Sequence, residues 1–237
     1  MNILQSGDKK SVLGKSRTQR SLVRSLKIII VTFLGMSLVN CGTVYYETME
    51  QFGVHKRDIL VDRVEEARDS QEAAKAQFSS ALEQFSALLN FDGGDLQATY
   101  DSLNTEFERS EDRANSVRDK IRSVESVSAD LFEEWEDELE LYTNQSLKQA
   151  SENSLRETRK LYQQLVTSMH TAENKMTPVI NAFRDQVLFL KHNLNSRAIA
   201  SLRTELVSIE GDISELIRDM EASISESNKF LSELSLI

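Results

Sequence analysis

The stretch LVDRVEEARDSQEAAKAQFSSALEQFSALL, residues 60–89, repeats an apolar or small residue at alternating steps of four and three. The positions are Leu60, Val64, Ala67, Gln71, Ala74, Phe78, Ala81, Phe85 and Leu88. Steps that average 3.5 residues align side chains along one face of an α-helix, as in the seam of a coiled coil. Gln71 is the one polar member. The stretch therefore predicts a long helix that buries this face against other helices.

Three later runs keep the same spacing. The second contains Leu96, Tyr100, Leu103, Phe107, Ser110, Ala114, Val117, Ile121, Val124, Ser128, Leu131 and Trp135, with Tyr142 in phase after a skipped position. The third contains Leu155, Thr158, Tyr162, Leu165, Met169, Ala172, Met176, Val179, Phe183, Val187, Leu190 and Leu194. The fourth contains Ile199, Leu202, Leu206, Ile209, Ile213, Leu216, Met220, Ile224, Phe230 and Leu234. Each run predicts another long helix with one buried face.

Short breaks separate the runs. Two glycines in FDGG, residues 91–94, end the first run, and Asp95 offers a side-chain cap to the next helix. The second run ends near TNQS, residues 143–146. The third helix is predicted to begin at Ser146 or at Ser154, because each has Gln or Glu three residues later. HNLNS, residues 192–196, is predicted to be the last turn.

Two positions are predicted to disturb the helices themselves. Asp130 and Glu133 have the spacing of a capping box, which favours a weak point near Ser128. Pro178 is the only proline in the chain. Because proline lacks an N–H group and crowds the preceding turn, the third helix should kink or restart there.

These runs predict the fold class. Runs of roughly 35–50 residues would form helices about 50–75 Å long. Short connections make consecutive helices antiparallel, so their apolar faces can be buried together in one bundle. We expect an all-α fold, an elongated antiparallel helical bundle or coiled coil of about four long helices, over residues 54–237.

The first forty residues differ from the rest in charge. Residues 1–40 contain seven basic side chains and one acidic side chain, a net charge of +6. The whole chain carries −10, so residues 41–237 carry −16. A basic region up to Lys27 precedes IIIVTFLGMSLV, residues 28–39, an apolar run too short to span a bilayer. This order is typical of a signal peptide, which we assign to residues 1–40.

The end of that segment resembles the bacterial lipobox, Leu38-Val39-Asn40-Cys41. In that motif the cysteine receives a diacylglyceryl group and becomes the new N-terminus. Leu38 and Val39 suit the pattern, whereas Asn40 stands where a small residue is usual. We therefore predict lipidation at Cys41 and assign residues 41–53 to an anchor and tether. Gly42 stands where an aspartate would retain a lipoprotein in the inner membrane, so the motif favours the outer membrane.

Other interpretations of Cys41 stay open. It is the only cysteine in the chain, so no intrachain disulfide can form. A buried structural thiol, a catalytic cysteine and an uncleaved membrane anchor are the alternatives to lipid attachment. Lipid attachment is favoured, because the residues around Cys41 have no core-forming period and no histidine is close in sequence.

A small group of residues beyond Cys41 could contact the membrane surface. Tyr45 and Tyr46 suit the interface between water and lipid, and Lys56 and Arg57 could bind anionic head groups. The alternative is that the two basic residues pair with acidic residues at the start of a helix.

Patterns that carry chemistry are scarce. Gly7 and Gly14 are separated by six residues, whereas a phosphate-binding loop requires four. His170 and Glu173 form one pair in reversed order, which cannot build a metal cage. EEWEDELE, residues 133–140, is interpreted as exposed acids with Trp135 in the seam. We therefore expect no enzyme activity, no cofactor and no metal, and the charge of −16 argues against nucleic acid as a partner.

Several passages resemble a known family. They are YYETMEQFGVHKRDILVDRVEEARDSQEAAKAQF (45–78), NFDGGDL (90–96), LFEEWEDELELY (131–142) and MTPVINAFRDQVLFLKHNLNSRAIASL (176–202). They are similar to an uncharacterised family of proteobacterial, mainly gammaproteobacterial, lipoprotein-like coiled-coil proteins, classed as a domain of unknown function. The resemblance implies a helical protein and carries over no binding or catalytic residue.

Two functional hypotheses follow. The first is a non-enzymatic envelope lipoprotein, anchored through Cys41, facing the periplasm, and binding other envelope proteins or itself. The alternative is a small-molecule carrier or enzyme that uses a pocket where helices splay, near Pro178 and the Gly93-Gly94 pair. A cytoplasmic coiled-coil protein is a third, less favoured interpretation.

Overall fold

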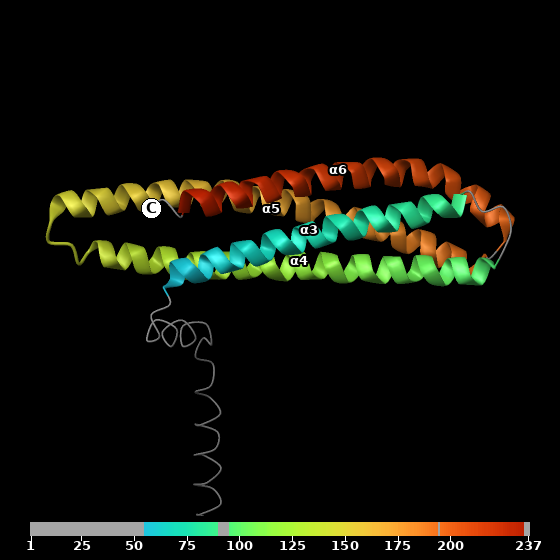
Figure 1. Ribbon diagram of the computed structural model, residues 1–237, viewed down its shortest axis with the longest axis horizontal. Coiled ribbons are helices and arrows are strands. Elements are labelled where there is room, and N and C mark those ends of the chain that lie inside the picture. Colours follow the sequence, from blue (N-terminus) through green and yellow to red (C-terminus); the bar gives the residue numbers. More distant parts are fainter. Residues whose placement is uncertain (1–54, 90–94, 194, 235–237) are drawn as a thin grey trace, which may run out of the picture. The chain divides into compact units, whose positions relative to one another are not determined.

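The computed structural model describes residues 55–89, 95–193 and 195–234, all within the predicted helical domain. They form four α-helices: α3 (Lys56–Leu89), α4 (Leu96–Leu139), α5 (Gln145–His192) and α6 (Ser196–Leu234). At 1.5 Å per residue these helices are about 50–70 Å long. The described residues contain no strand. The prediction of an all-α, elongated antiparallel bundle is confirmed (Figure 1).

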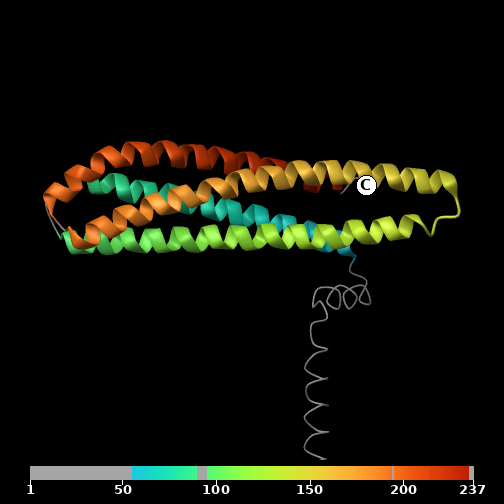
Figure 2. The same ribbon diagram turned by 180° about the vertical axis from the view of Figure 1, so that it is seen from behind.

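Consecutive helices run in opposite directions, and α6 returns to pack against α3 (Figures 1 and 2). Each helix therefore has two main neighbours, and the first and last helices close the bundle. One ion pair at each of the four interfaces shows the register: Glu66–Lys120, Glu111–Arg184, Lys175–Glu215 and Lys75–Glu221. The order of packing is therefore α3, α4, α5, α6 around the bundle.

The predicted seams form the core. In α3 and α6, every predicted seam residue whose side chain is described is buried, including Gln71. Aromatic rings join α3 to α5 through the centre, where Phe85 and Phe183 stack with their centroids 4.7 Å apart. Leu88 and Leu194 belong to the predicted seams but lie outside the described side chains. The 3.5-residue spacing therefore identified the buried face of these two helices correctly.

The seam of α4 was predicted less well. Leu103 through Leu131 follow the prediction with one exception, because Phe107 is half-buried and its neighbour Glu106 is buried. The ring of Phe107 lies beneath the guanidinium group of Arg184, 5.6 Å away, at the edge of the core. Leu96 and Tyr100, in the first turns of α4, are also half-buried.

Two of the predicted helix ends were correct. The carboxylate of Asp95 caps α4, accepting from the N–H groups of Gln97 at 2.9 Å and Ala98 at 3.2 Å. The α5–α6 connection falls within residues 192–196, as predicted. The two predicted starts of the third helix were wrong. Asn144 supplies the cap instead, because its side-chain oxygen accepts from the N–H groups of Ser146 and Leu147.

Helices α4 and α5 are continuous through the two positions that were predicted to disturb them. Helix α4 continues through Ser128, whose hydroxyl donates to the carbonyl of Val124 at 2.6 Å. The serine hydroxyl is therefore satisfied inside a continuous helix, and the capping-box spacing of Asp130 and Glu133 does not mark a helix start. Helix α5 continues through Pro178, which is exposed, and so does not restart there.

Candidate interaction surface

Most of the predicted membrane-attachment residues lie outside the described residues. They are Leu38, Val39, Asn40, Cys41, Tyr45 and Tyr46. Lipidation at Cys41 and surface contact by the two tyrosines therefore stay predictions. None of the four described helices is both long enough and apolar enough to cross a membrane.

Lys56 and Arg57, the other two residues of that group, make contacts inside the bundle. The ammonium group of Lys56 lies 3.2 Å from the carboxylate of Glu134 on α4. The guanidinium group of Arg57 donates to the main-chain carbonyl of Leu234 at the end of α6. Both side chains thus hold the start of α3 against its two neighbours. Their contact with lipid head groups stays a prediction.

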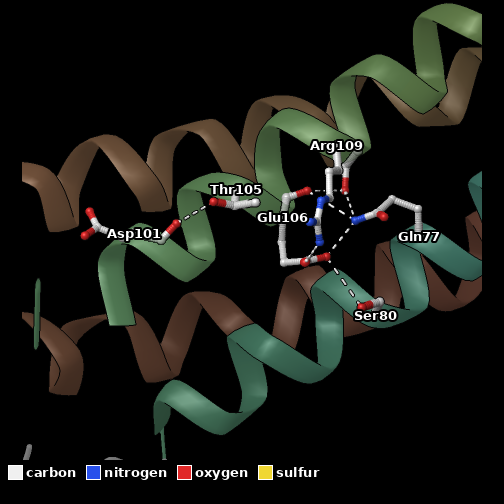
Figure 3. A network of polar contacts seen from close by, with 7 residues as sticks. Gln77, Ser80, Asp101, Thr105, Glu106 and Arg109 are labelled. Carbon is white, nitrogen blue, oxygen red and sulfur yellow. Dashed lines mark hydrogen bonds and ion pairs between the residues drawn. The ribbon is translucent and has the colours of Figure 1, made fainter. Parts of the chain in front are cut away.

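A buried carboxylate lies between α3 and α4 (Figure 3). Glu106 is 8% exposed, and its carboxylate accepts from the amide of Gln77 at 2.7 Å and from Arg109 at 2.9 Å. The hydroxyl of Ser80 adds a longer bond of 3.4 Å. A buried charge is tolerated when it is paired and hydrogen-bonded in this way.

This network is best explained as a clamp between helices. Gln77 and Ser80 come from α3, whereas Glu106 and Arg109 come from α4. The surface groove beside it is lined by Gln77, Arg109, Asp112 and Arg113, and the Glu106 carboxylate is not part of that lining. A general base must reach the proton that it abstracts. Glu106 instead directs its oxygens to donors within the bundle.

A second polar cluster joins α4 to α5. Nε2 of His170 lies 2.8 Å from Glu125, and Nδ1 lies 2.7 Å from Glu173. Burial alone would lower the pKa of His170, but the hydrogen bonds and charges of the two glutamates outweigh it and raise that pKa above its usual value. The sequence pattern identified Glu173 but missed Glu125, because Glu125 comes from another helix.

Each ring nitrogen of His170 is hydrogen-bonded to a carboxylate, so neither nitrogen is free to bind a metal in this arrangement. Across the described ranges, no group of three or more His, Cys, Asp or Glu residues is arranged to hold a metal ion. The cluster therefore acts as an ion-paired contact between two helices.

The joined ends of α4 and α5 extend beyond the start of α3 and the end of α6 (Figures 1 and 2). Lys56, at the start of α3, is level with Glu134 of α4. Lys229, near the end of α6, reaches Gln164 of α5 at 3.4 Å. We call residues 133–160 the α4–α5 tip. Over most of its length the tip is a two-helix hairpin, whereas the rest of the bundle has four helices.

The tip has a small interior of its own. Phe132, Leu139 and Leu155 are buried together, with Trp135 and Tyr162 packed against them. The indole N–H of Trp135 donates to the hydroxyl of Ser151 at 2.8 Å. Trp135 was predicted to be a core residue but is half-buried. Among the described residues, α3 begins at about this level, so Trp135 lies at the edge of the four-helix part of the bundle.

The outer surface of the tip is partly apolar. Leu141 is 78% exposed, Leu147 is 56% exposed and Tyr142 is 40% exposed. All three flank the turn between α4 and α5. Tyr142 was predicted to lie in the seam, but α4 ends at Leu139, before the seam reaches it. Large apolar side chains grouped at an exposed point often mark a site of protein contact.

The charges of the tip are divided between its two helices. Residues 133–140 carry six acidic side chains and no basic one. The opposing segment of α5, residues 145–160, carries four basic and two acidic side chains. Arg159 of α5 pairs with Glu136 of α4 at 2.5 Å, and Lys148 pairs with Glu140 at 3.0 Å. The tip therefore has an acidic helix and a basic helix.

Two surface grooves run from the tip along α5. The first, about 480 Å³, has Leu139 and Leu155 in its lining together with basic residues of α5. The second, about 780 Å³, lies between α5 and α6 and shares Lys160 and Gln163 with the first. None of the three grooves described above is lined by Pro178. Gly93 and Gly94, the other predicted pocket residues, lie outside the described residues.

A family model described as a protein of unknown function (DUF2959) matches residues 45–234, a range that includes all four helices. No curated protein matches the chain.

Proposed function

The chain belongs to the DUF2959 family of proteins of unknown function, and we propose that it is a non-enzymatic lipoprotein of the bacterial cell envelope. In this proposal Cys41 carries the lipid, the outer membrane holds the protein, and the helical bundle faces the periplasm. The bundle serves a structural or protein-binding role. The proposal includes two properties of the family: that its members come from proteobacteria and that they are lipoproteins.

The lipid anchor is supported by the sequence around Cys41. A basic region, a short apolar run and a lipobox-like end occur in the order that lipoprotein signal peptides require. One acyl chain holds a protein only marginally, whereas two or three hold it durably. A triacylated Cys41 would therefore keep the protein on the membrane without any spanning helix.

The interaction role is carried by one observation, the exposed apolar residues of the α4–α5 tip. Leu141, Tyr142 and Leu147 are not among the buried core residues and flank the turn at the extended end of the bundle. By contrast, the polar clusters at Glu106 and His170 are occupied with contacts between helices. The surface thus offers a place for a protein partner more readily than a site for chemistry.

The anchor is tested by metabolic labelling with a fatty acid analogue. Wild-type protein should take up the label and sediment with membranes, and Cys41→Ala should lose both properties. Gly42→Asp is the matched control: it should keep the label and move to the inner membrane. Label that persists in Cys41→Ala would overturn the proposed anchor.

The interaction role is tested by cross-linking in intact envelopes. Wild-type protein should give reproducible cross-linked species, and these should weaken when Leu141 and Leu147 are both changed to Ser. Recovery of a lone monomer from wild-type envelopes would contradict the role, whatever the labelling result.

A further inference from the structure

Among the described residues, only α4 and α5 reach the α4–α5 tip, so this part of the bundle is incomplete. Along the rest of α4 and α5, the neighbours α3 and α6 cover two further sides. Beyond Lys56 and Leu234 these neighbours have ended, while α4 and α5 continue to their turn (Figure 2). The packing of four antiparallel helices could be restored there by two helices from another molecule.

Two unpaired charge patterns lie on the exposed sides of the tip. Glu133 and Asp137 are one turn apart on α4, and both are exposed. Arg156 and Lys160 are one turn apart on α5, and both are exposed. Within the described ranges none of these four side chains has an ion-pair partner, in contrast to Arg159 and Lys148 nearby.

We propose that two copies of this chain associate through their tips, with α4 of each copy against α5 of the other. In a two-fold interface the same surface is used twice, so it must be complementary to itself. The tip meets this condition, because a two-fold axis would place the acidic α4 of each copy against the basic α5 of the other. The association also covers Leu141, Tyr142 and Leu147, which supply apolar area at the contact.

A second copy explains the tip better than an unrelated basic or acidic partner. A basic partner would match α4 but oppose α5, and an acidic partner would do the reverse. Residues 41–237 carry −16, so two copies repel each other over most of their surfaces. Opposite charges that meet at the tip therefore also select the orientation of the pair. This inference specifies the interaction role proposed above and does not depend on the lipid at Cys41.

The test uses purified full-length protein in detergent and measures the dimer dissociation constant by analytical ultracentrifugation. Variant one, Arg156→Glu with Lys160→Glu, makes both helices of the tip acidic. Variant two, Glu133→Lys with Asp137→Lys, places two basic side chains on α4 where they would face Arg156 and Lys160 of the other copy. Each should weaken the dimer by about tenfold or more, because like charges then face each other. The quadruple variant exchanges the two patterns and should restore the wild-type dissociation constant within about threefold.

The control is Glu108→Lys with Asp112→Lys, the same charge change as in variant two, on exposed positions of α4 outside the tip. It should leave the dimer unchanged. Circular dichroism confirms that each variant is folded, and Leu147→Ser provides a second, uncharged disruption. A wild-type monomer at all concentrations, or a folded quadruple variant that stays monomeric, would overturn the proposal. Tip-dependent cross-linking only to a different protein would also overturn it, while leaving the general interaction role intact.

Discussion

The side-chain amide of Gln77 donates to the carboxylate of Glu106 at 2.7 Å and so joins α3 to α4 (Figure 3). Gln71, six residues earlier on α3, is fully buried, yet among the described residues neither of its amide atoms has a hydrogen-bond partner. We therefore expect these two glutamines of α3 to have opposite effects on the free energy of unfolding. One satisfies a buried charge, and the other brings an unsatisfied amide into the core.

We expect Gln77→Leu to lower the free energy of unfolding by about 1–2 kcal/mol, because the Glu106 carboxylate loses a short hydrogen bond in a buried position. Denaturant unfolding followed by circular dichroism measures the change. Gln77→Glu is a harsher companion variant, since it places a second negative charge beside Glu106. A Leu variant as stable as wild type would show that the clamp contributes nothing.

Gln71→Leu should have the opposite sign and raise the free energy of unfolding by about 1–2 kcal/mol, because an apolar side chain of similar size replaces an unsatisfied amide. The same unfolding experiment measures it, with Gln77→Leu as the matched control on the same helix. A loss of stability would mean that the amide is satisfied in solution or that it fixes the register of the helices.

His170 should make stability depend on pH. Its pKa is raised in the folded protein by Glu125 and Glu173, so the stabilisation is fully present below the unfolded pKa of about 6.5 and is lost as pH rises through the folded pKa. Arg118, 4.0 Å from Glu173, also faces the cluster. The difference in melting temperature between wild type and His170→Gln should therefore be larger at pH 6 than at pH 9.

Asn174→Ala, an exposed change on α5 that alters no ionisable group, is the control for this pH dependence. It should change the melting temperature equally at both pH values. Equal effects of His170→Gln at pH 6 and pH 9 would contradict the role assigned to the two glutamates.

The cap at Asp95 should contribute to the stability of α4. Asp95→Ala removes the acceptor for the N–H groups of Gln97 and Ala98, which should cost about 1 kcal/mol. Asp95→Asn keeps an acceptor oxygen and should cost much less. Thermal unfolding separates the two variants, and equal losses would show that the cap bonds are not responsible.

Pro178 should destabilise α5. It lies inside a continuous helix and cannot donate a backbone hydrogen bond, so Pro178→Ala should raise the free energy of unfolding by about 1–3 kcal/mol. Asn174→Ala, one turn earlier and also exposed, tests helix propensity alone and should gain only a few tenths of a kcal/mol. A Pro178→Ala variant no more stable than Asn174→Ala would indicate that α5 already accommodates the proline without strain.

Much of the fold could be predicted because the decisive pattern is local. The 3.5-residue spacing and the turn residues identified the buried faces of α3 and α6 and the cap at Asp95. Contacts between helices were harder to predict, because the residues that meet depend on which turn of one helix lies beside which turn of another. Thus Glu125 beside His170 and Gln77 beside Glu106 could not be inferred from spacing within one run.

The tip was missed for a related reason. EEWEDELE was interpreted as a solvated face, and Trp135 and Tyr142 were assigned to a continuous core. The seam does continue in phase to Trp135, but periodicity does not show how many helices are present to cover it. The helix lengths in the structure show the difference, since α4 and α5 have 44 and 48 residues, against 34 and 39 for α3 and α6.

The pairing of α3 with α6 has a consequence for biosynthesis. The contacts Arg57–Leu234, Arg68–Asn228 and Lys75–Glu221 each connect residues more than 140 positions apart. A ribosome releases α6 after α3, α4 and α5, so one flank of α3 stays uncovered until the three later helices have been made. During that interval its apolar stripe is a natural target for chaperones, and premature termination within α6 would leave that stripe permanently uncovered.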